Sequence, residues 1–350
     1  MEPATLWPST SSSPASIPPL LDLTKLDYAG LLSGFGNLLG LLSLLLDRAA
    51  WNPSLLPEAG LLLADLGIAS IQPFSATSAL HHRWVWGEAG CEAYSFFGFV
   101  FGNYAIIAPF FIVLDRLLLL HDPAGTLFTS LPTLFLLTLP PTSTSAGLWR
   151  NWRCYAKLLV VLFAHSVFWA VGPLLGWGSY ALMPHRLSCT LNLSAHDAAY
   201  TSYMSAFTAL AYVLPIAAAI VALVIGRFHA PSLKHQWARN GRYKSLLAGL
   251  VLVPLLAYTP YALACFWAPA TKETAPIWLT TITPLTAKLG ALVNPWLLIL
   301  GQPRRARTAK ALLRQRTHYT FPPPEEAEER NEMGNYCADV CLVPVIPEEA

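Results

Sequence analysis

Seven long apolar stretches constrain the fold of this chain more than any other feature of its sequence. A helix needs roughly 20 apolar residues to cross the hydrocarbon core of a bilayer. Backbone that contacts lipid must satisfy its own hydrogen bonds, so continuous apolar stretches of this length predict membrane-spanning helices. The predicted spans lie near residues 28–46, 55–77, 91–120, 156–176, 202–226, 244–268 and 276–300.

The composition supports a multi-pass membrane protein. Charged residues make up 12% of the 350 residues, which is about half their share in a soluble domain. The six cysteines are too few for a disulfide scaffold in a chain of this length. We therefore expect an all-α bundle of seven transmembrane helices in the plasma membrane, with no metal site and no nucleic-acid partner.

The distribution of lysine and arginine predicts the orientation of the bundle. Cytoplasmic loops of membrane proteins carry an excess of both residues. Here the excess precedes span four, lies between spans five and six, and follows span seven, so the N-terminus is expected outside and the C-terminus inside. Asn192 of Asn-Leu-Ser then falls on the outer side, where glycosylation and a chance match to the tripeptide are equally plausible. The basic residues concerned are Arg150, Arg153, Lys157, Arg227, Lys234, Arg239, Arg242, Lys244, Arg304, Arg305, Arg307, Lys310, Arg314 and Arg316.

The bundle is expected over residues 28–302, between segments of different composition. Residues 1–27 are predicted to form a Ser- and Pro-rich extracellular leader, and the acidic residues 317–350 a disordered cytoplasmic tail. Residues 303–316 are predicted to form a short amphipathic helix at the inner membrane surface. Its basic residues Arg304, Arg305, Arg307 and Lys310 are expected to face anionic lipid headgroups.

Residues 121–146 do not fit this plan. They include an apolar run, Leu127 to Leu139, that is too short and too rich in proline for a span. A further span would also place the basic C-terminal segment outside. A cytoplasmic insertion, an interfacial segment and a translated intron are the three interpretations, and the last is favoured because the block carries no recognisable motif.

Lys288 is the most unusual residue in the predicted spans. No other charged residue occurs between Glu273 and Arg304, so Lys288 lies too deep to be an end residue that reaches the membrane surface. A charge inside a span is costly and marks a functional hypothesis. Because an amine in such a setting can attack an aldehyde to form an imine, Lys288 is a candidate attachment point for an aldehyde ligand.

Short motifs in the spans resemble, in their order and spacing, those of rhodopsin-like G-protein-coupled receptors. The resemblance covers roughly residues 28–302 apart from the insert. It implies a seven-helix receptor fold and a heterotrimeric G protein as partner. The matching residues are Gly36-Asn37, Leu63-Ala64-Asp65, Cys91, Leu114-Asp115-Arg116, Pro215, Tyr258-Thr259-Pro260-Tyr261 and Asn294-Pro295.

Ala287-Lys288, whose lysine precedes Pro295 by seven residues, resembles the retinal-attachment segment of opsins. Ser188-Cys189-Thr190-Leu191 and His82-Arg83-Trp84-Val85 are similar to neuropsins, with retinal G-protein-coupled receptor photoisomerases and peropsins as near alternatives. The resemblance implies retinal, 11-cis or all-trans, bound to Lys288 as a Schiff base. It also implies a pocket lined by Gly102, Tyr94, Tyr212, Tyr258 and Tyr261.

The charge of the predicted Schiff base depends on its acidic partner, because a nearby carboxylate favours the protonated form. Opsins place such a carboxylate at one of two positions, which Tyr94 and Met183 occupy here. Glu88 or Glu92 would have to compensate, and Glu92 is expected to point away from the pocket. We therefore predict an unprotonated Schiff base that absorbs in the ultraviolet.

The resemblance also implies a disulfide and a switch at the inner end of the bundle. Cys91 and Cys189 resemble the pair that ties the second outer loop to span three. Asp115 and Arg116 resemble the motif that engages the G protein, with an ion pair at the membrane interface as the alternative explanation. The same switch includes a polar network, expected to comprise Asp65, Asn37 and Asn294 beside Pro295.

Three residues depart from the receptor pattern and weaken the expectation of strong signalling. Leu223 and Leu298 stand where the family has tyrosines, and Tyr258 stands where it has a tryptophan. Hydroxyl residues are scarce in the tail, so arrestin binding is expected to be weak or absent. The leading function is a light-sensing retinal receptor without enzymatic activity. A retinal photoisomerase and a receptor for a diffusible ligand are the alternatives.

Overall fold

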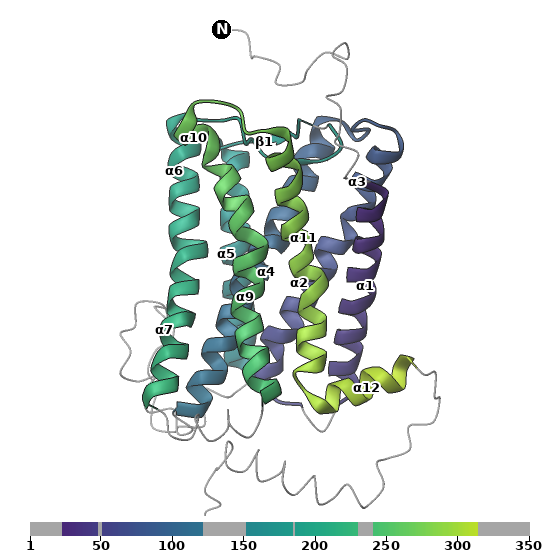
Figure 1. Ribbon diagram of the computed structural model, residues 1–350, viewed down its shortest axis with the longest axis vertical. Helices are drawn as coiled ribbons and strands as arrows, with labels where there is room; N and C mark the ends of the chain where they lie inside the picture. The colour runs from purple at the N-terminus through teal and green to yellow at the C-terminus, as the bar shows by residue number, and fades with distance from the viewer. Residues whose placement is uncertain (1–22, 48–50, 122–151, 185, 230–240, 314–350) are drawn as a thin grey trace, which may run out of the picture.

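The computed structural model of this protein describes residues 23–47, 51–121, 152–184, 186–229 and 241–313. Long helices stand side by side along the longest axis of the molecule, with a small hairpin of two strands at one end (Figure 1). The long segments are α1 (Leu23–Leu46), α2 (Leu56–Ser70) with α3 (Gln72–Leu80), α4 (Gly87–His121), α5 (Trp152–Val171), α6 (Ala198–Phe207) with α7 (Leu214–His229), α9 (Gly241–Cys265) and α11 (Ile277–Leu300). The short elements are η2 (Pro53–Leu55), η6 (Gly172–Leu175), β1 (Tyr180–Leu182), β2 (Cys189–Leu191), α10 (Trp267–Thr271) and α12 (Pro303–Leu313).

Each predicted span corresponds to a helical segment of this bundle. Six segments of the described chain are long and apolar enough to cross a membrane. The remaining one, α1, has 24 residues, includes the apolar stretch Gly30–Leu46, and packs against α2 and α11. The prediction of a seven-helix membrane bundle is therefore confirmed.

Two spans are irregular where the sequence pattern predicts continuous helix. The second span is divided into α2 and α3 by a turn at Ile71, and Pro73 follows at the second position of α3. Proline lacks a backbone N–H and cannot continue the helical hydrogen-bond ladder. In the fifth span, a π-helical segment, Thr208–Val213, joins α6 to α7 just ahead of Pro215. Such π segments are rare and occur mostly at functional sites.

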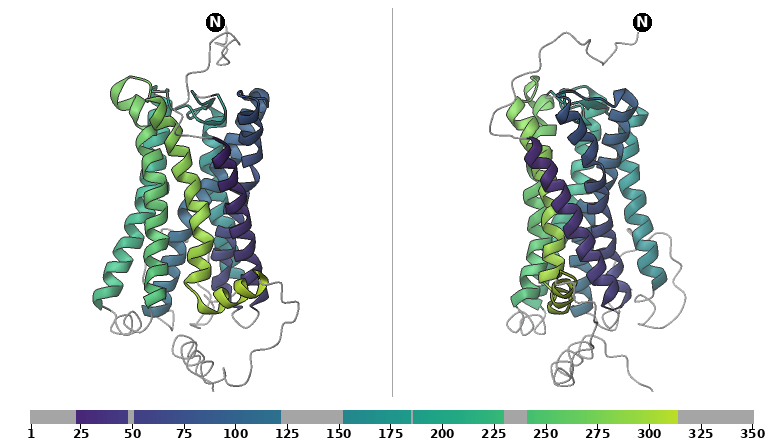
Figure 2. Two further views of the ribbon diagram at one scale, coloured as in Figure 1. Left: turned by 45° about the vertical axis from the view of Figure 1, so that its right-hand side comes forward. Right: turned by 90° about the vertical axis from the view of Figure 1, so that its right-hand side faces the viewer.

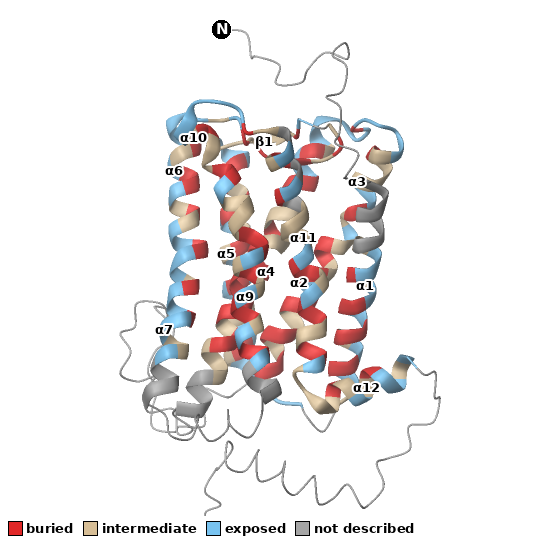
Figure 3. Cartoon of the chain, viewed as in Figure 1, coloured by how far each residue is buried: buried red, intermediate tan, exposed pale blue. Residues whose placement is uncertain are grey.

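The outer surface of the bundle is apolar, as contact with lipid requires. In α9, for example, the Leu256 and Leu263 side chains are 70% and 65% exposed, whereas the neighbouring Ala257 and Ala264 are buried. Figure 3 shows the buried residues turned toward the centre of the bundle and the exposed ones toward its outside. An apolar belt this extensive would be an association site in water and is the normal lipid contact of a membrane protein.

α12 follows α11 and lies across the inner end of the bundle (Figure 2). Its Ala309 packs with Leu39 and Ile299 in a small apolar cluster. Arg305, one helical turn earlier on the same face, is only 2% exposed and forms an ion pair with Glu58 of α2. The expectation that Arg305 faces lipid headgroups is therefore wrong, because this side chain points into the bundle.

Several predicted features lie outside the described residues. The insert at 121–146 is one of them, apart from His121, where α4 ends. The acidic tail at 317–350 and most of the leader at 1–27 are others, as is most of the basic segment between α7 and α9.

Candidate functional site

A cavity of about 140 Å³ opens inside the outer half of the bundle. Residues of α2, α3, α4, the β1–β2 loop, the fifth span, α9 and α11 line it, and most of them are apolar or aromatic. This is the usual character of a small-molecule site. The structure brings all six predicted pocket residues to this cavity, namely Lys288, Gly102, Tyr94, Tyr212, Tyr258 and Tyr261.

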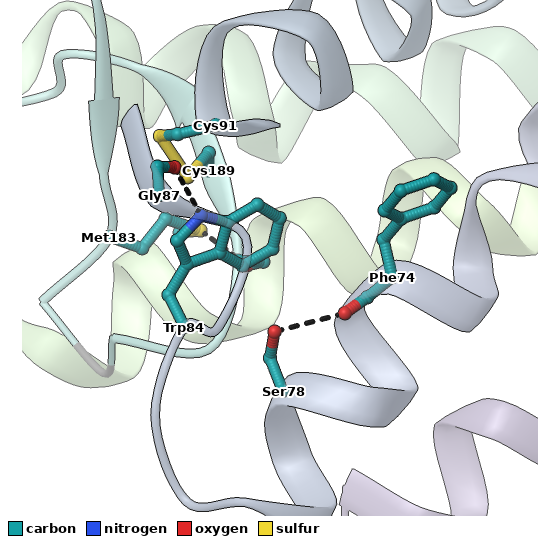
Figure 4. Close-up of a disulfide and its surroundings, with 8 residues drawn as sticks. Phe74, Ser78, Trp84, Gly87, Cys91, Met183 and Cys189 are labelled. Carbon is teal, nitrogen blue, oxygen red and sulfur yellow. Dashed lines mark hydrogen bonds between the residues drawn. A yellow bond between two sulfur atoms is a disulfide. The ribbon is translucent and has the colours of Figure 1, made fainter. Parts of the chain in front are cut away.

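The β-hairpin covers the cavity at the outer end and is fixed there by a disulfide. Cys91 at the start of α4 is bonded to Cys189 of β2, with their Cα atoms 5.4 Å apart, so the predicted disulfide is confirmed. Cys189 pairs with Leu182 across the two strands. Trp84 lies beside the disulfide, and its indole nitrogen donates a hydrogen bond of 2.8 Å to the carbonyl oxygen of Gly87 (Figure 4). The hairpin is thus held against α4 by a covalent bond.

Lys288 reaches the cavity from α11. Its Nζ atom donates a hydrogen bond of 2.7 Å to Oε1 of Gln72 at the start of α3. Among the described residues that line the cavity, none is Asp or Glu. Tyr94 and Met183 do line it, while Glu88 and Glu92 are exposed and lie outside the lining. The amine therefore faces a neutral amide and no lining carboxylate.

Gln72 is not among the site residues predicted from the sequence. A helix drawn straight through residues 55–77 gives no reason to single out a glutamine near its outer end. The turn at Ile71 ends that regular pattern before the residue is reached. The signal that could have revealed it is the Gln72-Pro73 pair, because proline disfavours the α-helical conformation in the residue before it.

Two of the tyrosines around the cavity form hydrogen bonds with threonine side chains through their hydroxyl groups. Tyr212 shares a hydrogen bond of 2.6 Å with Thr259, and Tyr261 shares one of 2.6 Å with Thr190 of the hairpin. Among the described residues, the hydroxyl of Tyr258 has no hydrogen-bond partner. Their aromatic rings therefore contribute mainly apolar surface to the cavity.

The described residues fit an elongated aldehyde such as retinal. A Cβ atom built on Gly102 would meet nothing within 4 Å, so the absence of a side chain there leaves open space in α4. The lining is predominantly apolar, which suits a polyene, and the one amine in it belongs to Lys288. Space, apolar surface and a nucleophile thus occur together.

The predicted polar network lies on the inner side of this cavity. Nδ2 of Asn294 donates a hydrogen bond of 2.9 Å to the Asp65 carboxylate. Nδ2 of Asn37 donates one of 2.8 Å to the backbone carbonyl of Ala291, one turn earlier in α11. α1 and α2 therefore both bond to α11 just ahead of Pro295, and Asp65 lies outside the cavity lining.

Arg116 is bound at the inner end of the bundle by a residue that sequence reasoning missed. Its guanidinium donates a hydrogen bond of 2.6 Å to the Glu58 carboxylate and another of 2.6 Å to Oγ of Ser54. The contact with the adjacent Asp115 is looser, at 4.0 Å. Glu58 is fully buried and also pairs with Arg305 of α12. A glutamate within the predicted span 55–77 was a visible signal, since a charge there needs a partner.

Asp115 has its own partner in α5. Its carboxylate accepts a hydrogen bond from the hydroxyl of Tyr155. On the outer side of the bundle, Asn192 follows β2, and its Oδ1 accepts a hydrogen bond of 3.2 Å from the backbone N–H of Ser194. The tripeptide Asn192-Leu-Ser thus forms a local turn at the end of the molecule that carries the hairpin.

Several known proteins are similar to this chain in sequence. The family model described as 7 transmembrane receptor (rhodopsin family) matches residues 36–138. The chain is 26% identical over 311 residues to the visual pigment-like receptor peropsin of Homo sapiens, covering 85% of this chain and 86% of the relative. It is 28% identical over 285 residues to Opsin-5 of Mus musculus, covering 77% and 70% respectively.

A crystal structure of squid rhodopsin has the same fold, with a TM-score of 0.68 at 18% identity over 98% of this chain and 99% of that one. Three observations agree with one another. They are the seven-helix bundle, the cavity with its lysine, and the similarity to opsins along most of the chain. The chain is therefore similar to opsins along most of its length, and it has the seven-helix fold of squid rhodopsin.

Proposed function

We propose that this chain is a light-sensing, non-visual opsin that carries retinal as a Schiff base on Lys288. The observation that supports this most directly is the position of the Lys288 amine, which lies in an apolar cavity under a hairpin fixed by a disulfide. The relatives named above are a visual pigment-like receptor and an opsin. A membrane helix has no structural need for a lysine at this depth.

The linkage needs only an amine and an aldehyde. The Lys288 nitrogen bonds to the carbonyl carbon, and one molecule of water leaves as the carbon–nitrogen double bond forms. Bound retinal supplies a double bond that light isomerises. Gly102 leaves space for the ligand, and the tyrosines of the fifth and sixth spans give the cavity its shape.

The contact between α9 and α11 is the natural route from the cavity to the inner end of the bundle. The Tyr258 ring lines the cavity and lies 3.7 Å from the Cβ position of Gly290 in α11. A change in ligand shape therefore acts on the two helices that pack most closely beside Lys288. We propose that two states of this contact are populated differently in the dark and in the light, with a heterotrimeric G protein as the partner at the inner end.

Replacing the lysine tests this proposal. Retinal-loaded protein is treated with borohydride, which reduces the Schiff base to a stable amine, and the labelled peptide is identified by mass spectrometry. We expect labelling at Lys288 in the parent chain and loss of labelling in Lys288→Ala. The matched control is Lys157→Ala, which removes an exposed lysine of α5 and should keep the label. Equal labelling of the parent and Lys288→Ala would exclude the proposed attachment site.

A retinal photoisomerase is the second candidate function. One observation that favours it is that Arg116 is bound to Glu58 and Ser54. The other is that Leu223 and Leu298 stand where signalling receptors of the family have tyrosines. Purified protein is illuminated and assayed in parallel for nucleotide exchange on a G protein and for conversion of retinal isomers. A receptor gives light-dependent exchange. Turnover of isomers without any exchange would replace the receptor proposal with the isomerase.

A further inference from the structure

The amide of Gln72 directly contacts the nitrogen that the proposed function requires. Nζ of Lys288 donates to Oε1 of Gln72 over 2.7 Å, and both residues line the cavity. Gln72 is only 6% exposed, so its side chain has little freedom to turn away. The two residues come from different helices, 216 positions apart in the chain. The hydrogen bond therefore joins the outer half of the second span to the middle of the seventh.

The local structure explains why Gln72 points inward. It is the first residue of α3, directly after the turn at Ile71, and Pro73 follows it. Its methylene groups lie against α1 at Gly30, where an added Cβ would come within 2.9 Å of the Gln72 Cγ atom. Glycine at position 30 leaves the space that the glutamine side chain fills. Packing against α1 and the helix break together direct the amide toward Lys288.

The charges around this nitrogen make the amide important. The other titratable side chains among the described lining residues are the tyrosines Tyr94, Tyr212, Tyr258 and Tyr261. Asp65 of α2 is hydrogen-bonded to Asn294 and lies outside the lining. Glu88 and Glu92 of α4 are exposed. Within the described part of the chain, Gln72 is the group in hydrogen-bond contact with the nitrogen, and it carries no net charge.

We propose that Gln72 positions the Lys288 nitrogen and determines its charge by occupying, with a neutral amide, the place where a carboxylate would act as counterion. This inference rests on the proposed function, because it concerns the nitrogen in its linkage to retinal. A side-chain amide can accept a hydrogen bond through its oxygen and donate one through its nitrogen. It can therefore hold the nitrogen in either protonation state, but it lacks the negative charge that would favour the protonated one.

Substituting Gln72→Glu supplies the missing charge with almost no change in shape. The full-length chain is loaded with retinal and its absorption spectrum is recorded. The parent chain is expected to absorb in the ultraviolet, and Gln72→Glu in the visible, because a protonated Schiff base absorbs at longer wavelength. The matched control is Gln302→Glu, the same amide-to-acid change just beyond the end of α11 and outside the cavity lining, which should stay in the ultraviolet. An ultraviolet spectrum for retinal-loaded Gln72→Glu, or a visible one for the parent, would overturn the inference.

A second measurement does not depend on retinal. Protein without retinal is treated with formaldehyde and cyanoborohydride, and the rate of methylation at Lys288 is followed by mass spectrometry. Only an uncharged amine reacts, and an adjacent carboxylate favours the charged form. Gln72→Glu should therefore slow methylation at Lys288 by roughly tenfold or more, whereas Gln302→Glu should leave the rate close to that of the parent. Equal rates in Gln72→Glu and the parent would contradict the assigned contact.

Gln72→Met separates positioning from charge. Methionine is similar in length to glutamine but cannot accept the hydrogen bond well, and it supplies no charge. In retinal-loaded protein this variant should keep ultraviolet absorption and should lose retinal to hydroxylamine faster than the parent. If Gln72→Met and the parent lost retinal to hydroxylamine at the same rate, Gln72 would have no role in positioning the Lys288 nitrogen.

Failure of this inference can be told apart from failure of the proposed function. If borohydride traps no retinal on the parent chain, the opsin proposal fails, while the methylation rates still report on the contact between Gln72 and Lys288. If retinal is trapped at Lys288 and neither the spectrum nor the methylation rate responds to Gln72→Glu, only the role of Gln72 is excluded.

Discussion

Two glycines show how single residues divide this bundle into packed and open regions. A Cβ atom at Gly67 of α2 would lie 2.6 Å from three ring atoms of Phe101 in α4. A Cβ atom at Gly102, the next residue along α4 from Phe101, would meet nothing within 4 Å. One position lets two helices approach each other, and the other leaves the cavity open.

Substitution by alanine should therefore affect the two glycines differently. Gly67→Ala forces the Phe101 ring to move and is expected to destabilise the bundle by about 1–3 kcal/mol, the usual cost of overpacking a core. Gly102→Ala should leave the thermal unfolding midpoint in detergent unchanged and should reduce retinal uptake. A lower unfolding midpoint for Gly102→Ala, or an unchanged midpoint for Gly67→Ala, would contradict the assignment of Gly67 to a packed region and Gly102 to an open one.

The residues that could be predicted from the sequence are those that break a local pattern. Lys288 was predicted because a charge interrupts a long apolar stretch, and the structure places it at the cavity. Gln72 has no charge and lies near the end of a span, so only the proline that follows it distinguishes the position in the sequence. Its importance comes from a contact between residues far apart in the chain, which only the folded structure brings together.

At the scale of helices, Glu58 connects three elements at the inner end of the bundle. It lies in α2, binds Arg116 of α4 at 2.6 Å, and pairs with Arg305 of α12. Glu58 and Arg305 are both buried. A buried charge that loses its partner is strongly unfavourable, so each member of this cluster depends on the others.

Removing the charge of Glu58 should weaken this end of the bundle. Glu58→Gln removes the anion that both guanidinium groups bind and leaves Arg116 its looser contact with Asp115. A loss of roughly 3–5 kcal/mol of stability is expected from breaking a buried pair. Thermal unfolding in detergent measures the loss. The exposed Glu88 at the outer end provides the control Glu88→Gln, which should leave the unfolding temperature unchanged. Similar shifts in the two variants would mean that the cluster has no special role.

Helix positions could be predicted well, and their irregularities could not. The third span was expected at 91–120, and α4 covers Gly87–His121, because hydrophobic length alone determines such a segment. The turn at Ile71 and the π-helical segment Thr208–Val213 lie inside equally apolar stretches. Hydrophobicity does not distinguish a regular turn of helix from an irregular one, so both had to be seen in the structure.

The whole molecule has two ends with different kinds of reinforcement. The outer end is closed by the hairpin and by the Cys91–Cys189 bond, which joins residues 98 positions apart. The inner end is held by the ionic cluster around Glu58 and by α12, which lies across it (Figure 2). The cavity lies between the two ends, nearer to the covalent one.

Loss of the disulfide should open the outer end without removing the Schiff-base lysine. Cys189→Ser is expected to accelerate the loss of retinal to hydroxylamine, because the hairpin is then held only by noncovalent contacts. Cys154→Ser, which alters a cysteine of α5 that is not disulfide-bonded, should leave the rate unchanged. An unaltered rate in Cys189→Ser would show that the hairpin covers the cavity without help from the disulfide.

The amide of Gln72 has a consequence for how this protein could change over generations. The codons for glutamine and glutamate differ in their first base alone, so one nucleotide substitution converts one residue into the other. If the amide determines the charge on the Lys288 nitrogen, that substitution moves the pigment from ultraviolet to visible light without rebuilding the cavity. The spectral range of this protein would then be open to natural selection through a single nucleotide substitution.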